Sequence, residues 1–288
     1  MSSSPINPEG QVLPPASAQQ YVSAQQYALA EPRARRRDFS VWDPRYAPGT
    51  YLLLAINVAV FFWMVAHGVS ARMPTDSQLV QYGANVTYLV LHGQWYRLLT
   101  AIFVHVGWIH IASNMWCLWN LGILGEPLIG PWGIVAVYMI TGVAGNLLSM
   151  GSNVVAFNVF HERYAVFIPG AGASGAVFGI AGILIVLLSN RKLPFPWGEL
   201  SRLRSSVVKF AAINLVIGLG TRVIPVGISI DNSAHIGGFL SGLALGVPLI
   251  PRMTAGRERY FARQRATFAA ACLLLALVGY YIARVANF

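Results

Sequence analysis

The segment PGAGASGAVFGIAGILIVLL occupies residues 169–188, where a run of small residues leads into an apolar stretch long enough for a membrane helix. A second segment, AHIGGFLSGLALG, occupies residues 234–246. Both carry glycines four residues apart: Gly175 and Gly179 in the first, Gly238, Gly242 and Gly246 in the second. Small residues at this spacing let two helix backbones approach closely in lipid. We therefore expect two closely packed membrane helices.

The composition indicates a helical membrane protein. Of the 288 residues, 56% are hydrophobic and 10% are charged, whereas an average soluble domain has about 25% charged residues. Apolar runs of roughly 20 residues match the hydrocarbon thickness of a bilayer. The spans that we predict are 50–69, 100–122, 131–150, 171–189, 206–224, 230–250 and 267–284. We therefore expect an all-α polytopic membrane protein with seven spans.

Basic residues predict how the spans are oriented, because cytoplasmic loops are enriched in Lys and Arg. With the N-terminus inside, the inner side holds Arg33, Arg35, Arg36, Arg37, Arg45, Arg191, Lys192, Arg202, Arg204, Lys209, Arg252, Arg257, Arg259, Arg263 and Arg265. The outer side holds Arg72, Arg97, Arg163, Arg222 and Arg284. These fifteen and five residues make up the 20 Lys and Arg. We expect a cytoplasmic N-terminus and an outer C-terminus, and no basic domain for nucleic acid.

The chain before the first span is rich in Ser, Pro, Gln and Ala and lacks the apolar core of a cleaved signal sequence. We expect a disordered, basic-ended cytoplasmic tail at 1–45, with the first span acting as the insertion signal. A six-helix membrane domain would occupy 46–250. A basic cytoplasmic linker at 251–266 would lead to a seventh transmembrane helix and the C-terminus at 267–288.

Few strongly polar side chains lie inside the predicted spans, where they are costly unless they have partners or a function. Spans two, four and six run inward, so residues early in each lie near the outer surface. Ser174 falls in about the first turn of span four, and His235 lies roughly five residues into span six. His110 and Asn114, four residues apart, share a face of span two. All four lie within about 15 Å of the outer helix ends and can meet in one cavity.

Other polar residues in the spans have simpler interpretations. We expect Asn57, Asn146 and Asn214 to form hydrogen bonds between helices, a common contact in membrane bundles. His105 also falls in span two, but off the face of His110, so we leave it out of the site.

The residues around Ser174 suit nucleophilic catalysis. Compact residues lead directly into the helix start, where free backbone N–H groups are natural donors to an oxyanion. Close helix packing would also bring the Ser174 hydroxyl within reach of an imidazole on another helix, as a nucleophile and its base require. The glycines could equally serve packing, and the two interpretations are compatible.

Three motifs resemble the signature motifs of the rhomboid family of intramembrane serine proteases. They are Gly172-x-Ser174-Gly175, Ala234-His235-x-Gly237-Gly238-x-x-x-Gly242 and His110-x-x-x-Asn114. Trp95-Tyr96-Arg97 and Glu126 match further family positions, although the family usually has Trp directly before Arg. The resemblance covers about 50–250 and implies a six-helix rhomboid-like bundle, with the tail and the seventh helix outside it.

The resemblance implies a catalytic dyad in which Ser174 attacks a peptide carbonyl and His235 takes the serine proton. It implies that His110, Asn114 and the backbone N–H of Ser174 stabilise the oxyanion. It also implies that Phe178 packs against the catalytic histidine. His110 and Asn114 could instead bond to each other within their helix, since spacing alone cannot assign a donor role.

A carboxylate lies near the predicted base, because Asp231 precedes His235 by one helical turn. The resemblance implies a dyad without a carboxylate. We therefore expect Asp231, Asn232 or Ser233 to cap the N-terminus of span six, with an orienting role for Asp231 as the alternative.

Other classes of protein fit the sequence less well. A zinc metalloprotease would have a His-Glu-x-x-His motif, but His161-Glu162 lacks the second histidine. An aspartyl protease would need two carboxylates in the membrane, and only Glu126, at a helix end, comes close. A transporter would show repeats or broken helices. Inactive rhomboid-like binding proteins typically lack the Ser or His that this chain keeps.

From the resemblance we expect an endopeptidase that cuts transmembrane helices of single-span or multi-span membrane proteins near their outer end, through an acyl-enzyme. Local unwinding must expose the bond, because a helix shields its carbonyls. We expect no metal or organic cofactor, and a bacterial inner (plasma) membrane, since nothing marks an organelle. Residues 151–168 would form a long connection that could border the substrate entrance. The oligomeric state is not predicted.

Overall fold

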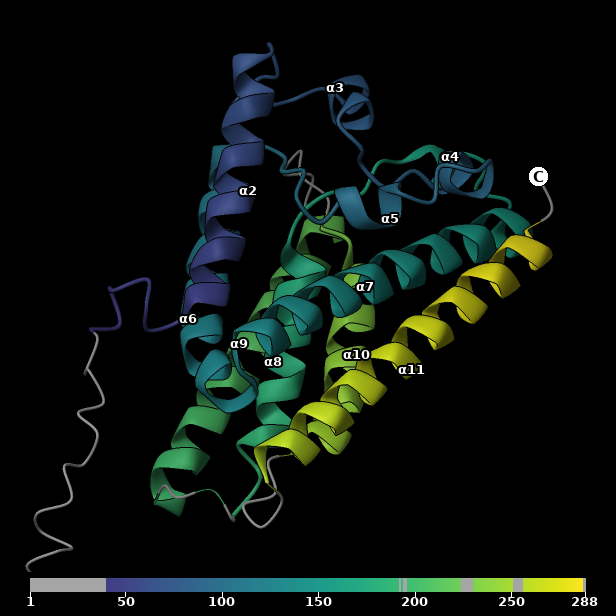
Figure 1. Ribbon diagram of the computed structural model, residues 1–288. Coiled ribbons are helices and arrows are strands. Elements are labelled where there is room, and N and C mark those ends of the chain that lie inside the picture. Colours follow the sequence, from purple (N-terminus) through teal and green to yellow (C-terminus); the bar gives the residue numbers. More distant parts are fainter. Residues whose placement is uncertain (1–39, 192, 194–195, 224–229, 251–255, 287–288) are drawn as a thin grey trace, which may run out of the picture. The chain divides into compact units, whose positions relative to one another are not determined.

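The computed structural model describes residues 40–191, 193, 196–223, 230–250 and 256–286. The chain divides into two units, Met1–Asp43 and Pro44–Phe288, and the second unit holds the described helices (Figure 1). The long helices are α2 (Pro48–Ala66), α6 (Trp108–Ile129), α7 (Pro131–Phe160), α8 (Ser174–Leu187), α9 (Trp197–Val223), α10 (Asn232–Leu249) and α11 (Arg257–Val285). The short ones are α3 (Asp76–Gln81), α4 (Thr87–Leu91), α5 (Arg97–Thr100) and the 3₁₀ turn Ala165–Phe167.

A glycine and a proline set the boundary between α6 and α7. Gly130 has a φ of 79°, a conformation that glycine adopts without strain, and its N–H bonds to the Glu126 carbonyl oxygen at 2.7 Å. Pro131 then begins α7, since the first helical position does not need an N–H. The chain therefore reverses sharply and α7 starts at once.

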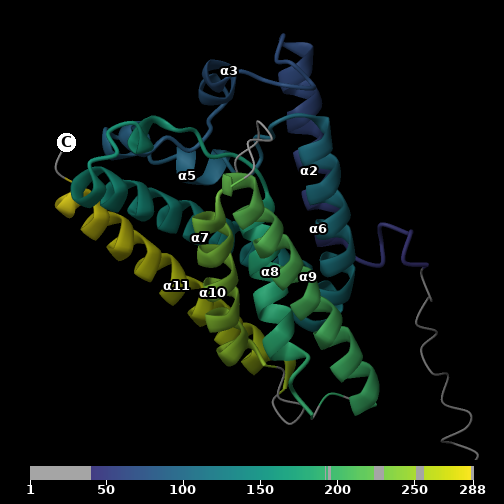
Figure 2. The same ribbon diagram turned by 180° about the vertical axis from the view of Figure 1, so that it is seen from behind.

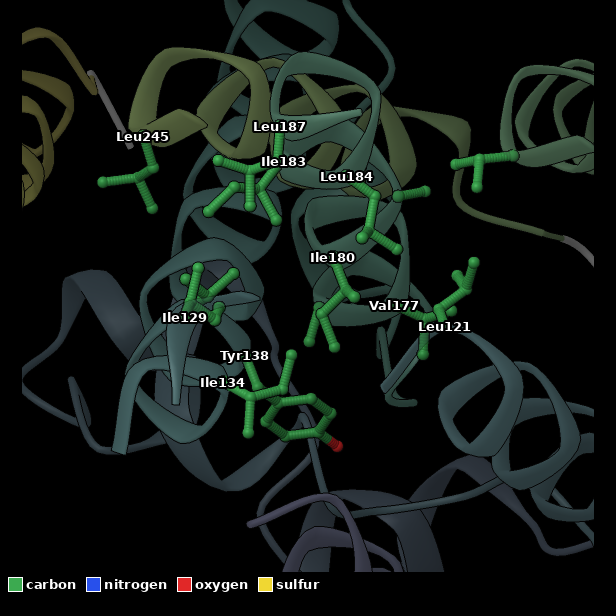
Figure 3. Packing of buried hydrophobic residues seen from close by; sticks show 14 of the residues in the cluster. Leu121, Ile129, Ile134, Tyr138, Val177, Ile180, Ile183, Leu184, Leu187 and Leu245 are labelled. Carbon is green, nitrogen blue, oxygen red and sulfur yellow. The ribbon is translucent and has the colours of Figure 1, made fainter. Parts of the chain in front are cut away.

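The short helix α8 packs against α6, α7, α9 and α10, and Figure 2 shows α8 beside α9 from behind. Its Ile180, Ile183, Leu184 and Leu187 are fully buried and interlock with side chains of α6 and α7, including Tyr138 (Figure 3). Helices in lipid associate largely through such van der Waals packing. The position of α8 is thus fixed by contacts on most of its surface.

The last helix, α11, runs beside α7 in the same direction (Figure 1). Near its start, the Gln264 side chain donates a hydrogen bond to the Ile129 carbonyl oxygen at 2.9 Å. Near its end, the Val285 carbonyl oxygen accepts one from Asn158 at 3.2 Å. The two helices are therefore parallel, and both begin at the same face of the unit.

Each predicted span overlaps one of the long helices. In the described residues, four helical segments are long and apolar enough to cross a membrane: Pro48–Ala66, Pro131–Phe160, Trp197–Gly220 and Glu258–Val285. Many large apolar side chains on α9 and α11 are exposed, as expected of helices that face lipid. The chain is an integral membrane protein with a helical fold, and the seven-span count and its orientation stay predictions.

Three helix boundaries differ from the predicted ones. Span two begins later, because Gly107, with a φ of 85°, precedes α6, so His105 lies in a loop. The predicted connection at 151–168 is helical to Phe160, where His161 ends α7 in a left-handed conformation. The predicted linker at 251–266 is helical from Arg257 onward. The polar side chains of 151–168 and 251–266 are typical of loops. In the structure, parts of both segments instead lengthen α7 and α11, which pack along each other.

The three asparagines predicted to join helices behave differently. Asn57 of α2 donates to the Tyr138 hydroxyl of α7 at 2.9 Å, as predicted. Asn146 of α7 donates to the Leu98 carbonyl oxygen in the short helix α5 at 2.8 Å. The amide of Asn214 donates to the Phe210 carbonyl oxygen of its own helix, and within the described residues it forms no bond with another helix.

A buried carboxylate ties α6 to the start of α2. Glu126 is 3% exposed and accepts hydrogen bonds from the backbone N–H of Gly49 at 2.9 Å and of Thr50 at 2.7 Å. The Thr50 hydroxyl donates a third bond to the same carboxylate at 2.7 Å. These bonds satisfy N–H groups of the first turn of α2 that have no partner within the helix.

The Glu126→Gln variant should be less stable by about 2 kcal/mol, because an amide NH₂ would face N–H and O–H donors that now meet a carboxylate. Thermal unfolding in detergent would measure the change. Glu162→Gln, at an exposed position, is the matched control and should unfold like the parent protein. Equal unfolding of both variants would contradict this account of Glu126.

Candidate active site

Glycines bring α8 and α10 into backbone contact. A Cβ added to Gly238 would overlap the carbonyl oxygen of Gly175, and one added to Gly242 would overlap that of Gly179. A Cβ on Gly175 would lie 3.2 Å from the Ala234 carbonyl oxygen. The close packing predicted from the glycine spacing is therefore present.

This contact places Ser174 and His235 at the same level of the interface. Ser174 is the first residue of α8 and precedes Gly175, while His235 follows Ala234 on α10. The His235 imidazole is 6% exposed and stacks on the Phe178 ring, with centroids 4.3 Å apart and planes 11° apart. Within the described residues, no hydrogen bond joins the two side chains. Such bonds are often long in a free enzyme and shorten when substrate binds.

The third predicted residue, His110, faces the backbone just before Ser174. Its Nδ1 accepts a hydrogen bond from the Val106 N–H at 3.2 Å, so the neutral ring carries its proton on Nε2. A Cβ added to Gly172 would lie 2.9 Å from this Nε2, and Gly172 has a φ of 128°. A glycine is thus required here, both for room and for conformation.

The fourth predicted residue, Asn114, is partly occupied by its own helix. Its side chain is 6% exposed, and its Nδ2 donates to the His110 carbonyl oxygen at 2.9 Å. This is the intrahelical bond considered as the alternative to an oxyanion role. An amide carries two N–H groups, so one remains for a ligand.

Three contacts fix the segment that leads into Ser174. Asn85 and Gly170 exchange two backbone hydrogen bonds of 2.8 Å, and the Gly172 N–H donates to the Ala101 carbonyl oxygen at 2.9 Å. His105, 1% exposed, accepts a long bond of 3.4 Å from the Ala173 N–H. His105 was excluded from the site, yet it supports this segment. In the sequence, the only indication of this role was that His105 lies close to His110.

Asp231 caps α10, as predicted. One carboxylate oxygen accepts from the backbone N–H groups of Ser233 at 3.0 Å and Ala234 at 3.1 Å. The other accepts a hydrogen bond from the Ser149 hydroxyl of α7. The cap holds the helix turn that carries His235, and no hydrogen bond links Asp231 to the imidazole in the described residues.

The loop before α6 is fastened by a buried arginine. Arg97, 6% exposed, donates to the Gln94 side chain at 2.6 Å and to the carbonyl oxygens of Val80 at 2.7 Å and Ala84 at 3.0 Å. Neighbouring Trp95 and Tyr96 are exposed, as expected of interfacial aromatic residues. The arginine of the WYR sequence thus shapes the loop whose Asn85 pairs with Gly170.

An apolar groove of about 580 Å³ lies between α6 and α9. Trp116 and Leu124 of α6 line one side, and Leu203 and Phe210 of α9 line the other. The Phe210 ring contacts Phe178 at a centroid distance of 6.1 Å. The groove therefore approaches the aromatic ring on which His235 stacks.

In the described residues, no group of three or more His, Cys, Asp or Glu side chains could hold a metal ion.

Comparison with known proteins points to one family. The family model described as Rhomboid domain matches residues 92–252. The rhomboid protease GluP of Bacillus subtilis is 33% identical over 225 residues, which are 76% of this chain and 39% of that protein. The rhomboid protease AarA of Providencia stuartii is 28% identical over 70% of this chain and 72% of its own length. RHOMBOID-like protein 5 of Arabidopsis thaliana is 33% identical over 64% of this chain and 53% of its own length.

The matched region runs from the loop before α5 to the end of α10, and it contains all four predicted site residues. The chain spans well under half the length of the Bacillus relative. Since the family model covers more than half of the sequence, the chain belongs to the rhomboid family.

Proposed function

We propose that this protein is an intramembrane serine endopeptidase with Ser174 as nucleophile and His235 as general base. The observation that supports this most directly is the backbone contact between α8 and α10, which puts both residues at one level. A hydroxyl and an imidazole at one level of two tightly packed helices are placed as a nucleophile and its base require. Relatives named rhomboid proteases support the same reaction class.

In the proposed reaction, His235 Nε2 removes the proton from Ser174 Oγ as the oxygen attacks the scissile carbonyl carbon. The carbonyl oxygen becomes an oxyanion that accepts hydrogen bonds from His110 Nε2–H, Asn114 and the Ser174 N–H. His235 then gives the proton to the leaving nitrogen, and an acyl-enzyme forms on Ser174. Water, deprotonated by His235, hydrolyses that ester and restores the serine.

The length of α8 supports a site below the outer membrane surface. Its 14 residues span about 21 Å, less than the hydrocarbon core of about 30 Å. If α8 ends at the inner surface, Ser174 lies within the outer part of the bilayer. We therefore propose cleavage near the outer end of a substrate helix. From the distribution of basic residues, we propose a cytoplasmic N-terminus and seven spans. The inner membrane of a bacterium is the proposed location.

We propose that the substrate helix reaches the dyad along the groove between α6 and α9. The groove is apolar and leads through Phe210 and Phe178 towards His235. Substrates would be single-span or multi-span membrane proteins with residues that weaken the helix near the cut, since only an unwound segment exposes its carbonyl.

A photo-reactive amino acid in place of Leu203, which lines the groove, should crosslink to a single-span substrate in the Ser174→Ala background. The same substitution at Leu274, an exposed residue of α11, provides the control and should give background adducts only. Equal yields at both positions would argue against this route to the site.

The His110→Ala variant should lower kcat by roughly 100-fold, the typical effect of losing one oxyanion donor. The physical reason is that the hydrogen bond at Nδ1 holds the His110 ring with its Nε2–H facing the segment before Ser174. Cleavage of a reporter substrate at saturation measures kcat, and His67→Ala, at an exposed position, should be unaffected. If His110→Ala kept its kcat within twofold, the residue would be a helix contact and no more.

A serine-directed fluorophosphonate tests the proposed function most directly. The purified protein should become labelled, and peptide mass spectrometry should locate the adduct on Ser174. The His235→Ala variant should label far more slowly, because the hydroxyl then lacks a base. Labelling at another serine, or none in a correctly folded sample, would reject the assignment, as would equal labelling of the two proteins.

A further inference from the structure

Two side chains at the start of α10 have buried polar atoms without hydrogen-bond partners. They are Asn232, whose Oδ1 and Nδ2 both lack a partner, and His235, whose Nδ1 lacks one. Their exposed fractions are 5% and 6%. Most buried polar atoms in proteins are paired, so each exception needs an explanation. That both occur on one turn, at the proposed base, suggests a common explanation.

Asn232 is three residues before His235, so the two side chains are neighbours on the helix surface. The Asn232 Oδ1 lies so close to Gly218 of α9 that a Cβ there would overlap it. The His235 ring stacks on Phe178, which contacts Phe210 of α9. The Asn232 amide is therefore directed towards α9, and the His235 ring lies against the α8 side chain that α9 also contacts.

The proposed mechanism requires a hydrogen-bond acceptor beside His235 Nδ1. For Nε2 to accept the serine proton, the neutral ring must carry its one N–H hydrogen on Nδ1. When the ring becomes an imidazolium, that N–H bears positive charge, and a hydrogen bond to it strengthens. Phe178 offers no such acceptor. The Asp231 carboxylate accepts two N–H groups and the Ser149 hydroxyl, and within the described residues it forms no hydrogen bond with the imidazole.

We propose that Asn232 is a positioning residue for the base: its Oδ1 accepts a hydrogen bond from His235 Nδ1–H, after a rotation of the amide or through one water molecule. This would fix the reactive tautomer and stabilise the imidazolium, in the manner of the asparagine in Cys-His-Asn proteases. An amide does so without burying a second charge. The proposal rests on the proposed function of His235 as base.

Kinetics and nuclear magnetic resonance together test this role in the full-length protein. Asn232→Ala should lower kcat by about 10- to 100-fold, the effect of losing a hydrogen bond to a charged group, with little change in KM. Asn232→Asp keeps an acceptor oxygen and should retain more activity than Asn232→Ala. Ser233→Ala, on the same turn, should match the parent protein.

A spectroscopic measurement keeps the test valid if Asn232→Ala folds poorly. In protein labelled with ¹⁵N-histidine, His235 Nδ1–H should give a slowly exchanging, downfield proton signal, assigned by its loss in His235→Ala. Asn232→Asp should retain the signal, and Asn232→Ser should lose it. A kcat for Asn232→Ala within twofold of the parent, or a signal unchanged in Asn232→Ser, would overturn the proposal. Failure of Ser174 to react with a fluorophosphonate would instead overturn the proposed function.

Discussion

Replacing Ser174 with alanine should abolish cleavage of a single-span reporter substrate, with kcat falling by roughly a million-fold, as when other serine proteases lose their nucleophile. His235→Ala should have a comparable effect, since an unassisted hydroxyl is a weak nucleophile. The double variant should be no slower than either single one, because the two residues act as a unit. Cleavage in detergent, followed by gel electrophoresis, measures all three rates.

The matched control for these variants is Ser205→Ala, at an exposed position of α9, which should cleave like the parent protein. All variants should share the parent's unfolding temperature, because each removes few packed atoms. If Ser174→Ala retained measurable turnover, another residue would be the nucleophile. Additive losses in the double variant would show that Ser174 and His235 act independently.

Much of the helical arrangement can be predicted from the sequence, because apolar runs and small-residue spacing are local properties. The glycines of α8 and α10 are an example. Gly175 and Gly179, like Gly238 and Gly242, are four residues apart, which predicted close helix packing. The structure shows backbone contact between α8 and α10. The start of α6 could not be found in the same way. The apolar residues before Gly107 are typical of a membrane span, but residues 101–107 form turns and a loop, and Gly107, with a positive φ, directly precedes α6.

The supports of the site were harder to predict than its reactive residues. His105 reaches the Ala173 N–H across a large sequence separation, so its role depends on the tertiary fold. Asp231, Asn232 and Ser233 were equivalent candidates for the helix cap. The structure assigns the cap to Asp231 and leaves the Asn232 amide without a partner. A sequence pattern gives the types of residue present, whereas the direction of each side chain follows from packing.

Gly238→Ala should both destabilise the protein and impair catalysis. The added methyl group would overlap the Gly175 carbonyl oxygen, which belongs to a helix backbone and cannot turn away as a side chain could. The helices would have to separate, at a cost of about 3 kcal/mol, the upper part of the usual range for overpacking. Separation would move His235 away from Ser174, and a shift of about 1 Å can cost roughly 100-fold in rate.

Thermal unfolding and the rate of fluorophosphonate labelling at Ser174 would measure the two effects of Gly238→Ala separately. Gly198→Ala is the control, because a Cβ there meets no atom within 4 Å. Alanine is also favoured over glycine within a helix, so this control should unfold at the same temperature or slightly higher. Labelling of Gly238→Ala should be slow even well below its unfolding temperature, since the damage lies in the spacing of the two helices. Parent-like labelling and stability would mean that α8 and α10 need not touch for the site to work.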